Sequence, residues 1–392
     1  MLDDERLRAS RGELFIHLES LLMMTLVHVT TPAAYGGLER VVAGLCTETA
    51  ARGHRVVLVL LLLPEFPVPE WASKLSASNV VLEPLHIPRR AYLRERSIVR
   101  TMLSQYGASV LHTHGYRADV LHASVARSLG IALVSTAHGF ASLDTRGRFY
   151  EWLQRRVWRG FDAVVAVSQP LLDTLARAGV GNDRLMHIRT GLSSASPTPL
   201  PRAEARRRLN LPADRQVLGW VGRMSDEKSP SLAIEALART PADGPVLCMV
   251  GGGPQLQPCR RLATELGVGD RVVFAGPVPD AAPLLGAFDG LVLSSKTEGT
   301  PMVVLEASAA SIPVIATAVG GVPELLRDDG GWLVPPGDAT ALAAAIMDAL
   351  VRPLEAERRA QRLRRNLAGN EGGPDWIDQY LALYARLSRS RL

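Results

Sequence analysis

Short apolar runs of up to eight residues alternate with amphipathic segments along this 392-residue chain. The runs are rich in Val, Leu and Ile, as in strands that are covered on both faces of a parallel sheet. The segment 38–52 has apolar residues at 38, 41, 42, 45 and 46, the spacing of a helix with one buried face. The pattern therefore predicts an α/β protein built from βαβ units. The runs expected to be strands are 24–29, 56–63, 110–112, 132–135, 163–167, 217–221, 246–250, 272–274, 291–293 and 314–315.

A Ser- and Pro-rich stretch at 193–203 divides this pattern into two series and is typical of an interdomain linker. The length and the 47% hydrophobic content allow two cores, each of about 180 residues. We therefore expect residues 24–195 and 196–370 to form two Rossmann-like domains that face each other across a cleft, with ligand sites at the carboxyl ends of the strands. Residues 1–23 precede the first convincing strand, and whether this extension belongs to the native protein stays open. Residues 371–392 have the periodicity of a final helix.

The net charge of +5 is confined to one half of the chain. Residues 1–195 hold 22 Lys+Arg and 17 Asp+Glu, whereas residues 196–392 hold 22 of each. A basic half attracts anionic partners, such as a lipid surface or a phosphorylated acceptor. Nucleic acid is not an expected partner, because no recognition motif accompanies the charge.

Cysteine usage and the absence of long apolar runs indicate a cytoplasmic protein. Cys46, Cys248 and Cys259 are scattered without disulfide or metal-ligand spacing, which favours a reducing compartment. The first segment lacks the pattern of a secretory signal, and no run approaches the roughly 18 apolar residues of a membrane span. Peripheral contact with the inner face of a membrane remains a further hypothesis.

The segment 294–307 combines a buried strand end with the start of a helix. Gly299 permits a tight turn, Thr300 is expected to be the N-cap, and Pro301 suits the first helical position. A helix start presents unpaired N–H groups and a partial positive charge, so it can bind a diphosphate. The residues expected to hold a donor phosphate here are Gly299, Thr300, Pro301, Met302 and Val303.

Two carboxylates bracket this helix start. Glu298 precedes it, and Glu306 should lie roughly 9 Å further along, at a helical rise of about 1.5 Å per residue. That is about the separation between a pyrophosphate and the hydroxyls of its ribose, so the segment is typical of a nucleotide-sugar site. The alternative for each residue is an ordinary acid on a helix surface or loop. For Glu306 this is less favourable, because an unpaired carboxylate between Leu305 and Ala307 would be costly to bury.

Arg223 and Lys228 follow the strand at 217–221 and lie at the mouth of a βα loop. Two cations placed there can neutralise a departing diphosphate, the role of a divalent metal ion in other transferases. The alternative is that Lys228 is a solvated loop residue. We also find no Asp-x-Asp motif, which argues against a metal-dependent transferase.

Two further motifs follow strands of the first series. Gly36 and Gly37 lie in the first βα loop, where glycine lets the backbone approach a ligand closely, although a plain tight turn is the alternative. His112, His114 and His138 lie at strand ends, where each could contact a ligand or form hydrogen bonds in the interior.

Basic and aromatic residues are interleaved between 146 and 161. Such a helix suits an interfacial contact with an anionic membrane, and the alternative is a packed helix with a solvated Arg face. The residues concerned are Arg146, Arg148, Phe149, Tyr150, Trp152, Arg155, Arg156, Trp158, Arg159 and Phe161.

Together these motifs resemble a known family. Glu298 and Glu306 bracket seven residues that include Gly299 and Pro301, and the chain continues with Ile-Pro-Val-Ile-Ala at 312–316 and Gly-Gly-Val-Pro-Glu at 320–324. This resembles the Glu-x7-Glu signature of retaining glycosyltransferases with the GT-B fold, in particular the large fourth family of bacterial α-glycosyltransferases. The resemblance spans the chain from about residue 24.

The resemblance implies roles for individual residues. His138 would reach the transferred sugar, Glu298 would approach its hydroxyls, and Glu306 would hold the ribose. The loop Gly36-Gly37-Leu38-Glu39 would lie against the donor phosphate or sugar, and the loop at 274–279, with Val278, would grip the base through backbone groups. His112 and His114 resemble the His-x-His of the family and would contact the acceptor. Ser229 departs from the glycine that usually follows the lysine, and the final helix would cross back to the first domain.

We therefore expect a retaining glycosyltransferase that moves a hexosyl group from a nucleotide diphosphate sugar to an acceptor hydroxyl in polysaccharide, glycolipid or other glycoconjugate biosynthesis. The resemblance implies that it needs no metal and no cofactor besides this donor, and that a diphosphate oxygen accepts the proton of the acceptor. A sugar-nucleotide epimerase or a non-catalytic binding module with the same fold is the alternative. The set of Arg223, Lys228, Glu298 and Glu306 favours catalysis over the module.

Overall fold

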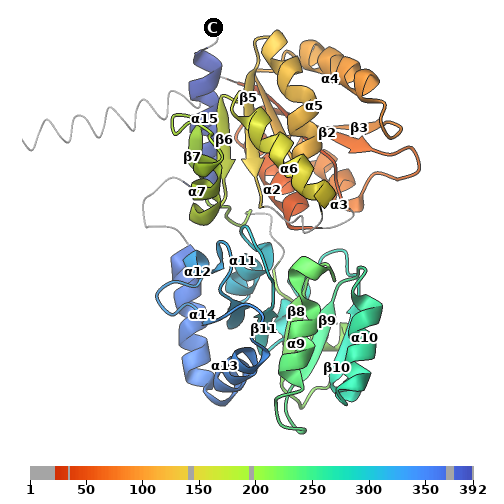
Figure 1. Ribbon diagram of the computed structural model, residues 1–392, viewed down its shortest axis with the longest axis vertical. Coiled ribbons are helices and arrows are strands. Elements are labelled where there is room, and N and C mark those ends of the chain that lie inside the picture. Colours follow the sequence, from red (N-terminus) through yellow and green to blue (C-terminus); the bar gives the residue numbers. More distant parts are fainter. Residues whose placement is uncertain (1–22, 34–35, 140–144, 194–197, 368–374, 391–392) are drawn as a thin grey trace, which may run out of the picture.

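The computed structural model describes residues 23–33, 36–139, 145–193, 198–367 and 375–390. The extension 1–23 lies outside this description except for Met23. Two parallel sheets form the centres of two α/β domains, one above the other in Figure 1. This is the expected arrangement of two Rossmann-like domains.

The first sheet has seven strands in the order β3-β2-β1-β4-β5-β6-β7. Its register is parallel throughout, and β2 buries seven of its eight residues. The strands are β1 (Thr25–Thr30), β2 (Arg55–Leu62), β3 (Val80–His86), β4 (Val110–His114), β5 (Ala132–Ala137), β6 (Ala163–Ala166) and β7 (Leu185–His187). The helices around them are α2 (Gly37–Ala51), α3 (Glu70–Ser73), the 3₁₀ helix η1 (Lys74–Ser78), α4 (Tyr92–Tyr106), α5 (Tyr116–Ser128), α6 (Thr145–Trp158) and α7 (Gln169–Arg177).

The second sheet has six strands in the order β10-β9-β8-β11-β12-β13 and is also parallel. The strands are β8 (Val217–Val221), β9 (Val246–Val250), β10 (Val272–Gly276), β11 (Gly290–Leu293), β12 (Val314–Thr317) and β13 (Trp332–Val334). Its α-helices are α8 (Arg202–Arg208), α9 (Pro230–Leu237), α10 (Leu256–Glu265), α11 (Met302–Ala309), α12 (Val322–Leu325), α13 (Ala339–Val351) and α14 (Pro353–Leu367). Three short 3₁₀ helices complete it, η2 (Asp226–Lys228), η3 (Gly269–Arg271) and η4 (Ala282–Ala287).

The last helix, α15 (Trp376–Arg389), lies beside the first sheet, although it follows the second domain in sequence (Figure 1). The rings of Tyr380 and Tyr384 are fully buried there. The Tyr384 hydroxyl is 2.6 Å from Nδ1 of His112, and the Tyr380 hydroxyl is 2.8 Å from Oγ1 of Thr136. The helix therefore contributes both apolar area and hydrogen bonds to the first domain.

Each sheet reverses its strand order at one place, between β1 and β4 in the first and between β8 and β11 in the second. In open α/β sheets, ligands bind in the crevice outside the carboxyl ends of the strands at such a switch point. The loops that follow these four strands are therefore expected to carry the ligand site.

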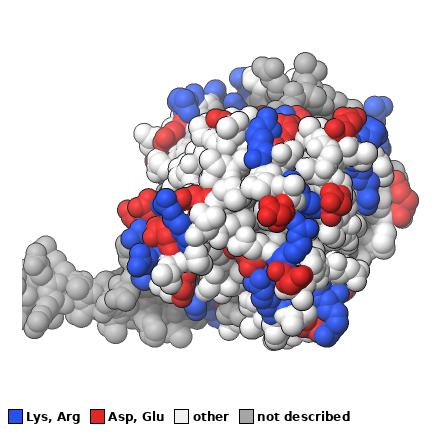
Figure 2. Space-filling view, turned by 90° about the horizontal axis from the view of Figure 1, so that it is seen from below, with Lys and Arg blue, Asp and Glu red and all other residues white. Residues whose placement is uncertain are grey.

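Charge on the surface of the second domain is mixed. The face seen in Figure 2, which belongs to the second domain, carries basic and acidic side chains interspersed, as the balanced charge of this half of the chain predicts. Among the residues described, no helix combines the length and the apolar character that crossing a bilayer requires.

Candidate active site

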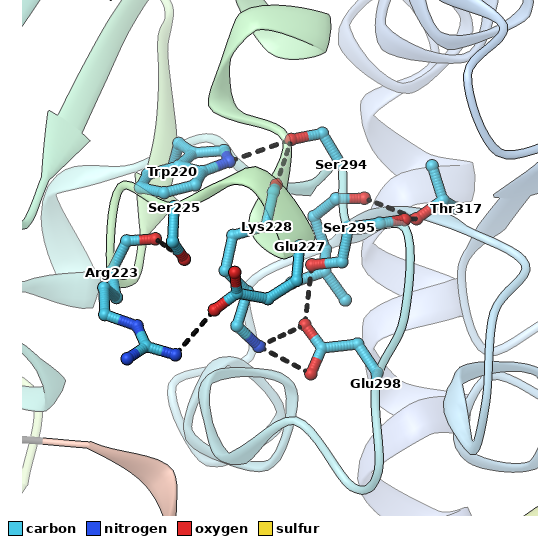
Figure 3. A network of polar contacts seen from close by, with 10 residues as sticks. Trp220, Arg223, Ser225, Glu227, Lys228, Ser294, Ser295, Glu298 and Thr317 are labelled. Atoms are coloured by element: carbon cyan, nitrogen blue, oxygen red, sulfur yellow. Dashed lines mark hydrogen bonds and ion pairs between the residues drawn. The ribbon is translucent and has the colours of Figure 1, made fainter. Parts of the chain in front are cut away.

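An ion pair between Lys228 and Glu298 joins the loops that follow β8 and β11 (Figure 3). Nζ of Lys228 lies 2.7 Å from both carboxylate oxygens of Glu298, and the hydroxyl of Ser295 donates to the same carboxylate at 2.6 Å. The Glu298 side chain is 5% exposed and that of Lys228 is 28% exposed. The lysine is therefore not a solvated loop residue in this conformation, and its charge is held by Glu298 near the carboxyl ends of β8 and β11.

The backbone around Lys228 is fixed from the neighbouring strand. The hydroxyl of Ser294 lies 3.2 Å from the carbonyl oxygen of Lys228 and 2.8 Å from that of Ser229, and it accepts a hydrogen bond from the Trp220 indole (Figure 3). Ser229 has φ 44° and ψ 56°, a left-handed conformation that glycine adopts at lower cost. The loop thus keeps a conformation that suits glycine, although the residue here is serine.

Arg223 points to another partner. Its guanidinium is 67% exposed and lies 2.6 Å from Oε1 of Glu227, rather than beside the Lys228–Glu298 pair (Figure 3). Burial raises the pKa of Glu39, and the charge of Arg223 partly opposes that rise. Arg223 therefore lies near the first turn of α2, which carries Glu39.

The start of α11 differs from the expectation in one respect. The helix begins at Met302, and Pro301 is the N-cap with an extended backbone (φ −70°, ψ 111°), so the predictions that Thr300 caps the helix and that Pro301 is its first residue are wrong. The Thr300 hydroxyl instead donates to the carbonyl oxygen of Val167, which directly follows β6 in the first domain, at 2.8 Å. An acceptor from the other domain thus competes with the helix amides. As a result, no side chain caps the first turn, which includes Met302 and Val303.

Glycines let the two domains touch at this helix start. A side chain at Gly299 would collide with the carbonyl oxygen of His138, and one at Gly321 would lie 2.9 Å from Cβ of Ser168 in the first domain. Gly37, on the first turn of α2, faces the side chain of Met302. His138 is thereby placed against the loop that leads into α11.

Glu306 is buried, and its ion-pair partner comes from the other domain. The guanidinium of Arg40, on α2, bonds to Glu306 and also lies 2.7 Å from the carboxylate of Asp280. Burial raises the pKa of Glu306, whereas the charge of Arg40 lowers it. Sequence reasoning missed both Arg40 and Asp280, although Arg40 directly follows the Gly-Gly-x-Glu motif.

The first βα loop is organised by Glu39. Its side chain accepts a hydrogen bond from the backbone amide of Ala33 at 2.7 Å. A side chain at Gly36 would collide with the Glu39 carboxylate, so glycine there allows the acid to fold back toward the loop. Gly36 itself is extended, with φ −175°.

Four histidines form a contiguous group on the first domain. In the register of the sheet, His28 pairs with His112, and Thr30 pairs with His114, so these side chains lie on one face. Nδ1 of His28 lies 3.1 Å from Nε2 of His114, and Nδ1 of His114 lies 3.3 Å from Nε2 of His138. Burial lowers the pKa of His28 to about 3 and that of His138 to about 4.

His112 occupies the interior position that the sequence left open as its alternative. Its Nδ1 lies 2.6 Å from the Tyr384 hydroxyl, and its Nε2 lies 2.8 Å from Oγ1 of Thr136. Both ring nitrogens are thus engaged by protein groups. Nitrogens of His28, His112 and His114 lie within 4.8 Å of one another, a spacing that a metal ion could also bridge. The hydrogen bonds account for this spacing without an ion.

Val278 lies in the loop after β10 and lines a cavity of about 430 Å³ beside η4. Asp280, the second partner of Arg40, lines the same cavity. The cavity therefore lies next to the Arg40–Glu306 pair. The candidate site residues thus fall into three places, namely the loops that carry Lys228 and Glu298, the histidine group and this cavity.

Family models match both halves of the chain. The model described as Glycosyltransferase Family 4 matches residues 35–195, and the model described as Glycosyl transferases group 1 matches residues 201–366. The D-inositol 3-phosphate glycosyltransferase of Acidothermus cellulolyticus is 30% identical over 356 residues, which cover 82% of this chain and 80% of that protein. The 2-deoxystreptamine N-acetyl-D-glucosaminyltransferase of Streptomyces fradiae is 30% identical over 389 residues, or 88% of each chain.

Solved structures share the fold at lower identity. Anabaena HepE in complex with UDP-glucose has a TM-score of 0.79 at 22% identity, with 92% of this chain and 98% of that chain covered. Sucrose-phosphate synthase from Thermosynechococcus elongatus has a TM-score of 0.78 at 24% identity, with 94% and 100% covered. With the matching family models and full-length relatives, these findings show that the chain is a glycosyltransferase of the GT-B fold and belongs to the glycosyl transferases group 1 family.

Proposed function

We propose that this glycosyltransferase moves a hexosyl group from a nucleotide diphosphate sugar to an acceptor hydroxyl, with retention of configuration and without a metal ion. The observation that carries the proposal is the Lys228–Glu298 pair beside an uncapped helix start. A cation and a carboxylate that are already paired in the cleft can exchange this contact for the phosphate and the sugar hydroxyls of one donor. The epimerase and the binding module named above are not favoured by the relatives.

The donor would lie along the start of α11. Its diphosphate would meet the free amides of Met302 and Val303 together with Lys228, and Arg223 would reach it by leaving Glu227. The ribose would then reach Glu306, about 6 Å along the helix from Met302 at about 1.5 Å per residue.

The base and the sugar would lie at opposite ends of this donor. The base would enter beside Val278 and Asp280, where the cavity of about 430 Å³ opens. At the other end, the transferred sugar would lie between Glu298 and His138, because the loop before α11 touches the His138 backbone.

Transfer would break the bond between the anomeric carbon and the diphosphate oxygen and form a bond to the acceptor oxygen on the same face. The acceptor proton would pass to an oxygen of the departing diphosphate, so no protein nucleophile is needed. Negative charge grows on the diphosphate as the bond breaks, and Lys228, Arg223 and the helix amides would stabilise it there. These groups would take the place of a divalent metal.

The acceptor is proposed only as a class. One relative is named for D-inositol 3-phosphate and another for 2-deoxystreptamine, so relatives of similar identity act on different acceptors. The shared feature that we carry over is an acceptor hydroxyl, in polysaccharide, glycolipid or other glycoconjugate biosynthesis.

The direct test is a thermal-shift panel of UDP, GDP and ADP sugars, because a ligand that binds the folded state raises its melting temperature. The stabilising donor is then incubated with candidate acceptors, and free nucleotide is followed over time. Transfer predicts nucleotide release that depends on acceptor, with the anomeric configuration kept in the product. An epimerised donor, or binding without turnover across the acceptor panel, would contradict the proposal.

We also propose peripheral contact of α6 with an anionic membrane at the inner face. Phe149 and Trp152 are 57% and 56% exposed, and their rings stack with centroids 5.9 Å apart. Arg156 is exposed on the same helix, whereas Trp158 is buried at its end. The helix thus buries one face, through Gln154 and Trp158, and presents aromatic and basic side chains on another. The side chains of Arg146 and Arg148 lie outside the described residues.

Vesicle sedimentation tests this contact. Changing Phe149, Trp152 and Arg156 to Ser, Ser and Glu should abolish sedimentation with vesicles that contain anionic lipid and leave donor binding unchanged. The matched control is Leu354→Ser on α14, a residue that is 70% exposed in the other domain. A wild-type protein that does not sediment would favour a soluble acceptor at this surface.

A further inference from the structure

Three of the four histidines form a chain of hydrogen bonds that ends at the cleft. The chain runs from His28 on β1 to His114 at the end of β4 and then to His138 after β5. We propose that His28 and His114 are positioning residues that determine which ring nitrogen of His138 carries its proton. The proposal rests on the proposed function in so far as His138 faces the transferred sugar.

All three rings are neutral at ordinary pH. Burial lowers the pKa of His28 to about 3 and that of His138 to about 4, and burial together with the neighbouring rings lowers the pKa of His114 well below its usual range. A neutral imidazole carries one N–H donor and one lone-pair acceptor. Each hydrogen bond in the chain therefore dictates the role of both nitrogens in the next ring.

The buried end of the chain sets its direction. Nε2 of His28 is buried and has no hydrogen-bond partner among the described residues. A buried N–H without a partner is rarer than a buried acceptor without one, because the lost donor bond is costly. Nε2 of His28 should accordingly be the unprotonated nitrogen, and the proton of His28 should lie on Nδ1, which faces His114.

The rest of the chain follows ring by ring. Nδ1–H of His28 donates to Nε2 of His114 at 3.1 Å, so the His114 proton must lie on Nδ1. Nδ1–H of His114 donates to Nε2 of His138 at 3.3 Å, so the His138 proton lies on its Nδ1. The opposite direction would leave an N–H group buried without an acceptor at His28.

This tautomer limits what His138 can do. Its basic lone pair on Nε2 is already occupied by His114, so the remaining nitrogen offers a ligand a hydrogen-bond donor and no base. A donor suits an oxygen of the transferred sugar. The acceptor proton must then go elsewhere, which agrees with its transfer to the departing diphosphate.

The fourth histidine does not take part. His112 has its two nitrogens engaged by Tyr384 and Thr136, and no hydrogen bond joins it to the other three rings among the residues described. Its contacts tie α15 to the sheet. The chain is consequently a linear one, with one beginning and one end.

Tautomers can be read directly by NMR. The full-length protein is labelled with ¹⁵N in its imidazole rings, and long-range ¹H–¹⁵N correlations report which nitrogen of each ring carries the proton. The signals of His138 are those that disappear in His138→Gln. We expect protonated Nδ1 at His138, and a wild-type protein with protonated Nε2 would overturn the proposal without any variant.

Two substitutions at His28 test the cause. His28→Phe removes the first donor, so His138 should populate both tautomers and turnover should fall about tenfold, with the donor KM changed less than twofold. His28→Asn keeps an N–H near the position of Nδ1 and should restore both the tautomer and most of the turnover. An unchanged His138 tautomer in His28→Phe, or unchanged turnover despite a changed tautomer, would overturn the positioning role.

A control separates this role from stability. His54 is also buried and accepts a hydrogen bond from the Met24 amide, but it lies outside the chain of three rings. His54→Phe should lower the melting temperature and leave the His138 spectrum as in the wild type. One equivalent of tightly bound transition metal that is lost in His28→Phe would overturn the relay.

The spectrum needs no substrate, so it is independent of the proposed function. The expected tautomer in a protein that transfers no sugar would count against the transferase proposal alone. Transfer by a protein with the opposite tautomer would count against the relay alone.

Discussion

The two walls of the cleft are polar in different ways. The wall from the second domain carries ion pairs, Lys228 with Glu298 and Arg223 with Glu227. The wall from the first domain carries buried neutral histidines joined to one another. The loops of the second domain therefore present paired charges, whereas the histidine group of the first domain presents neutral donors and acceptors.

Charged and neutral groups suit different parts of a ligand. An unpaired charge is costly to bury, so charged groups that await a charged ligand hold one another in its absence. A diphosphate can replace such a partner charge for charge. Neutral imidazoles suit hydroxyl groups, which they can orient by hydrogen bonding without a change of charge. We therefore expect the second domain to hold the diphosphate, with Glu298 reaching the transferred sugar, and the histidines of the first domain to orient hydroxyl groups of the sugar and the acceptor.

Arg40 is the exception that connects the walls. It comes from the first domain and pairs with Glu306 and Asp280 of the second. Because Glu306 is proposed to hold the ribose, the donor must replace Arg40 at this carboxylate. Donor binding and the contact between the domains are accordingly expected to be coupled.

Among the substitutions considered, Lys228→Ala should reduce activity most. We expect turnover to fall by about a hundredfold or more, the loss typical of removing one pre-positioned charge-stabilising group from an active site. Donor affinity should fall less than turnover, because the cation acts mainly on charge that develops in the transition state. Steady-state kinetics and calorimetric titration measure the two effects. Lys296→Ala is the control, because Lys296 is 49% exposed and pairs with the exposed Asp226. Near-normal turnover of a folded Lys228→Ala protein would shift the role to Arg223.

Glu306→Ala should weaken donor binding by about tenfold to a hundredfold, the range expected when hydrogen bonds to a charged group are lost. The fold should be intact, since the small side chain leaves Arg40 near solvent and close to Asp280. Calorimetry with the identified donor measures the dissociation constant, and Glu265→Ala on the exposed face of α10 is the control. An unchanged dissociation constant in Glu306→Ala would contradict the assignment of Glu306 to the ribose.

Arg40→Ala should change how donor binding depends on pH. Burial raises the pKa of Glu306 and Arg40 opposes the rise, so removing Arg40 should raise this pKa further. An ionised Glu306 accepts from both ribose hydroxyls, so donor affinity should fall as the pH drops through the pKa of this group, and the fall should begin at higher pH in the variant.

Protein stability should show the opposite trend. A carboxyl with a raised folded-state pKa stabilises the fold most below its unfolded-state pKa, and this contribution is lost as the pH rises through the folded-state value. Donor-binding and melting curves measured over a pH series test both trends. The donor affinity should change severalfold across the series. Glu306→Gln should lack both dependences, and identical pH profiles in the wild type and Arg40→Ala would separate Arg40 from the site.

EDTA should leave turnover unchanged within error, because Lys228, Arg223 and the start of α11 supply the positive charge in place of a metal ion. The measurement is initial rate with identified donor and acceptor before and after dialysis against the chelator. Loss of activity that Mg²⁺ or Mn²⁺ restores would mean that Lys228, Arg223 and the start of α11 do not replace a metal ion.

Most of the architecture could be predicted from the sequence. Each of the ten apolar runs coincides with a strand, with at most one residue beyond its end, because a strand covered on both faces must be almost continuously apolar. Three strands were missed, namely β3, β7 and β13. All three are edge strands with partial burial; polar residues interrupt the apolar signal in β3 and β7, and β13 is only three residues long.

The site divides in the same way. Lys228 and Glu298 could be singled out from the sequence because they follow apolar strands, and Glu306 because it lies in the next helix, α11; their roles in binding stay predictions. The prediction for Thr300 was wrong, because its hydroxyl found a carbonyl acceptor in the other domain rather than the amides of its own helix.

The chain by itself determined which residues are buried, which loops follow strands, and where charge and glycine lie. Only the tertiary structure decided that Arg40 meets Glu306, that Tyr384 meets His112, and that the imidazoles of His28 and His138 are joined through a third ring. The physical reason is that periodicity along a chain shows that a face is covered, but not by what. Partners separated by hundreds of residues are chosen by how helices pack on sheets and how two domains meet.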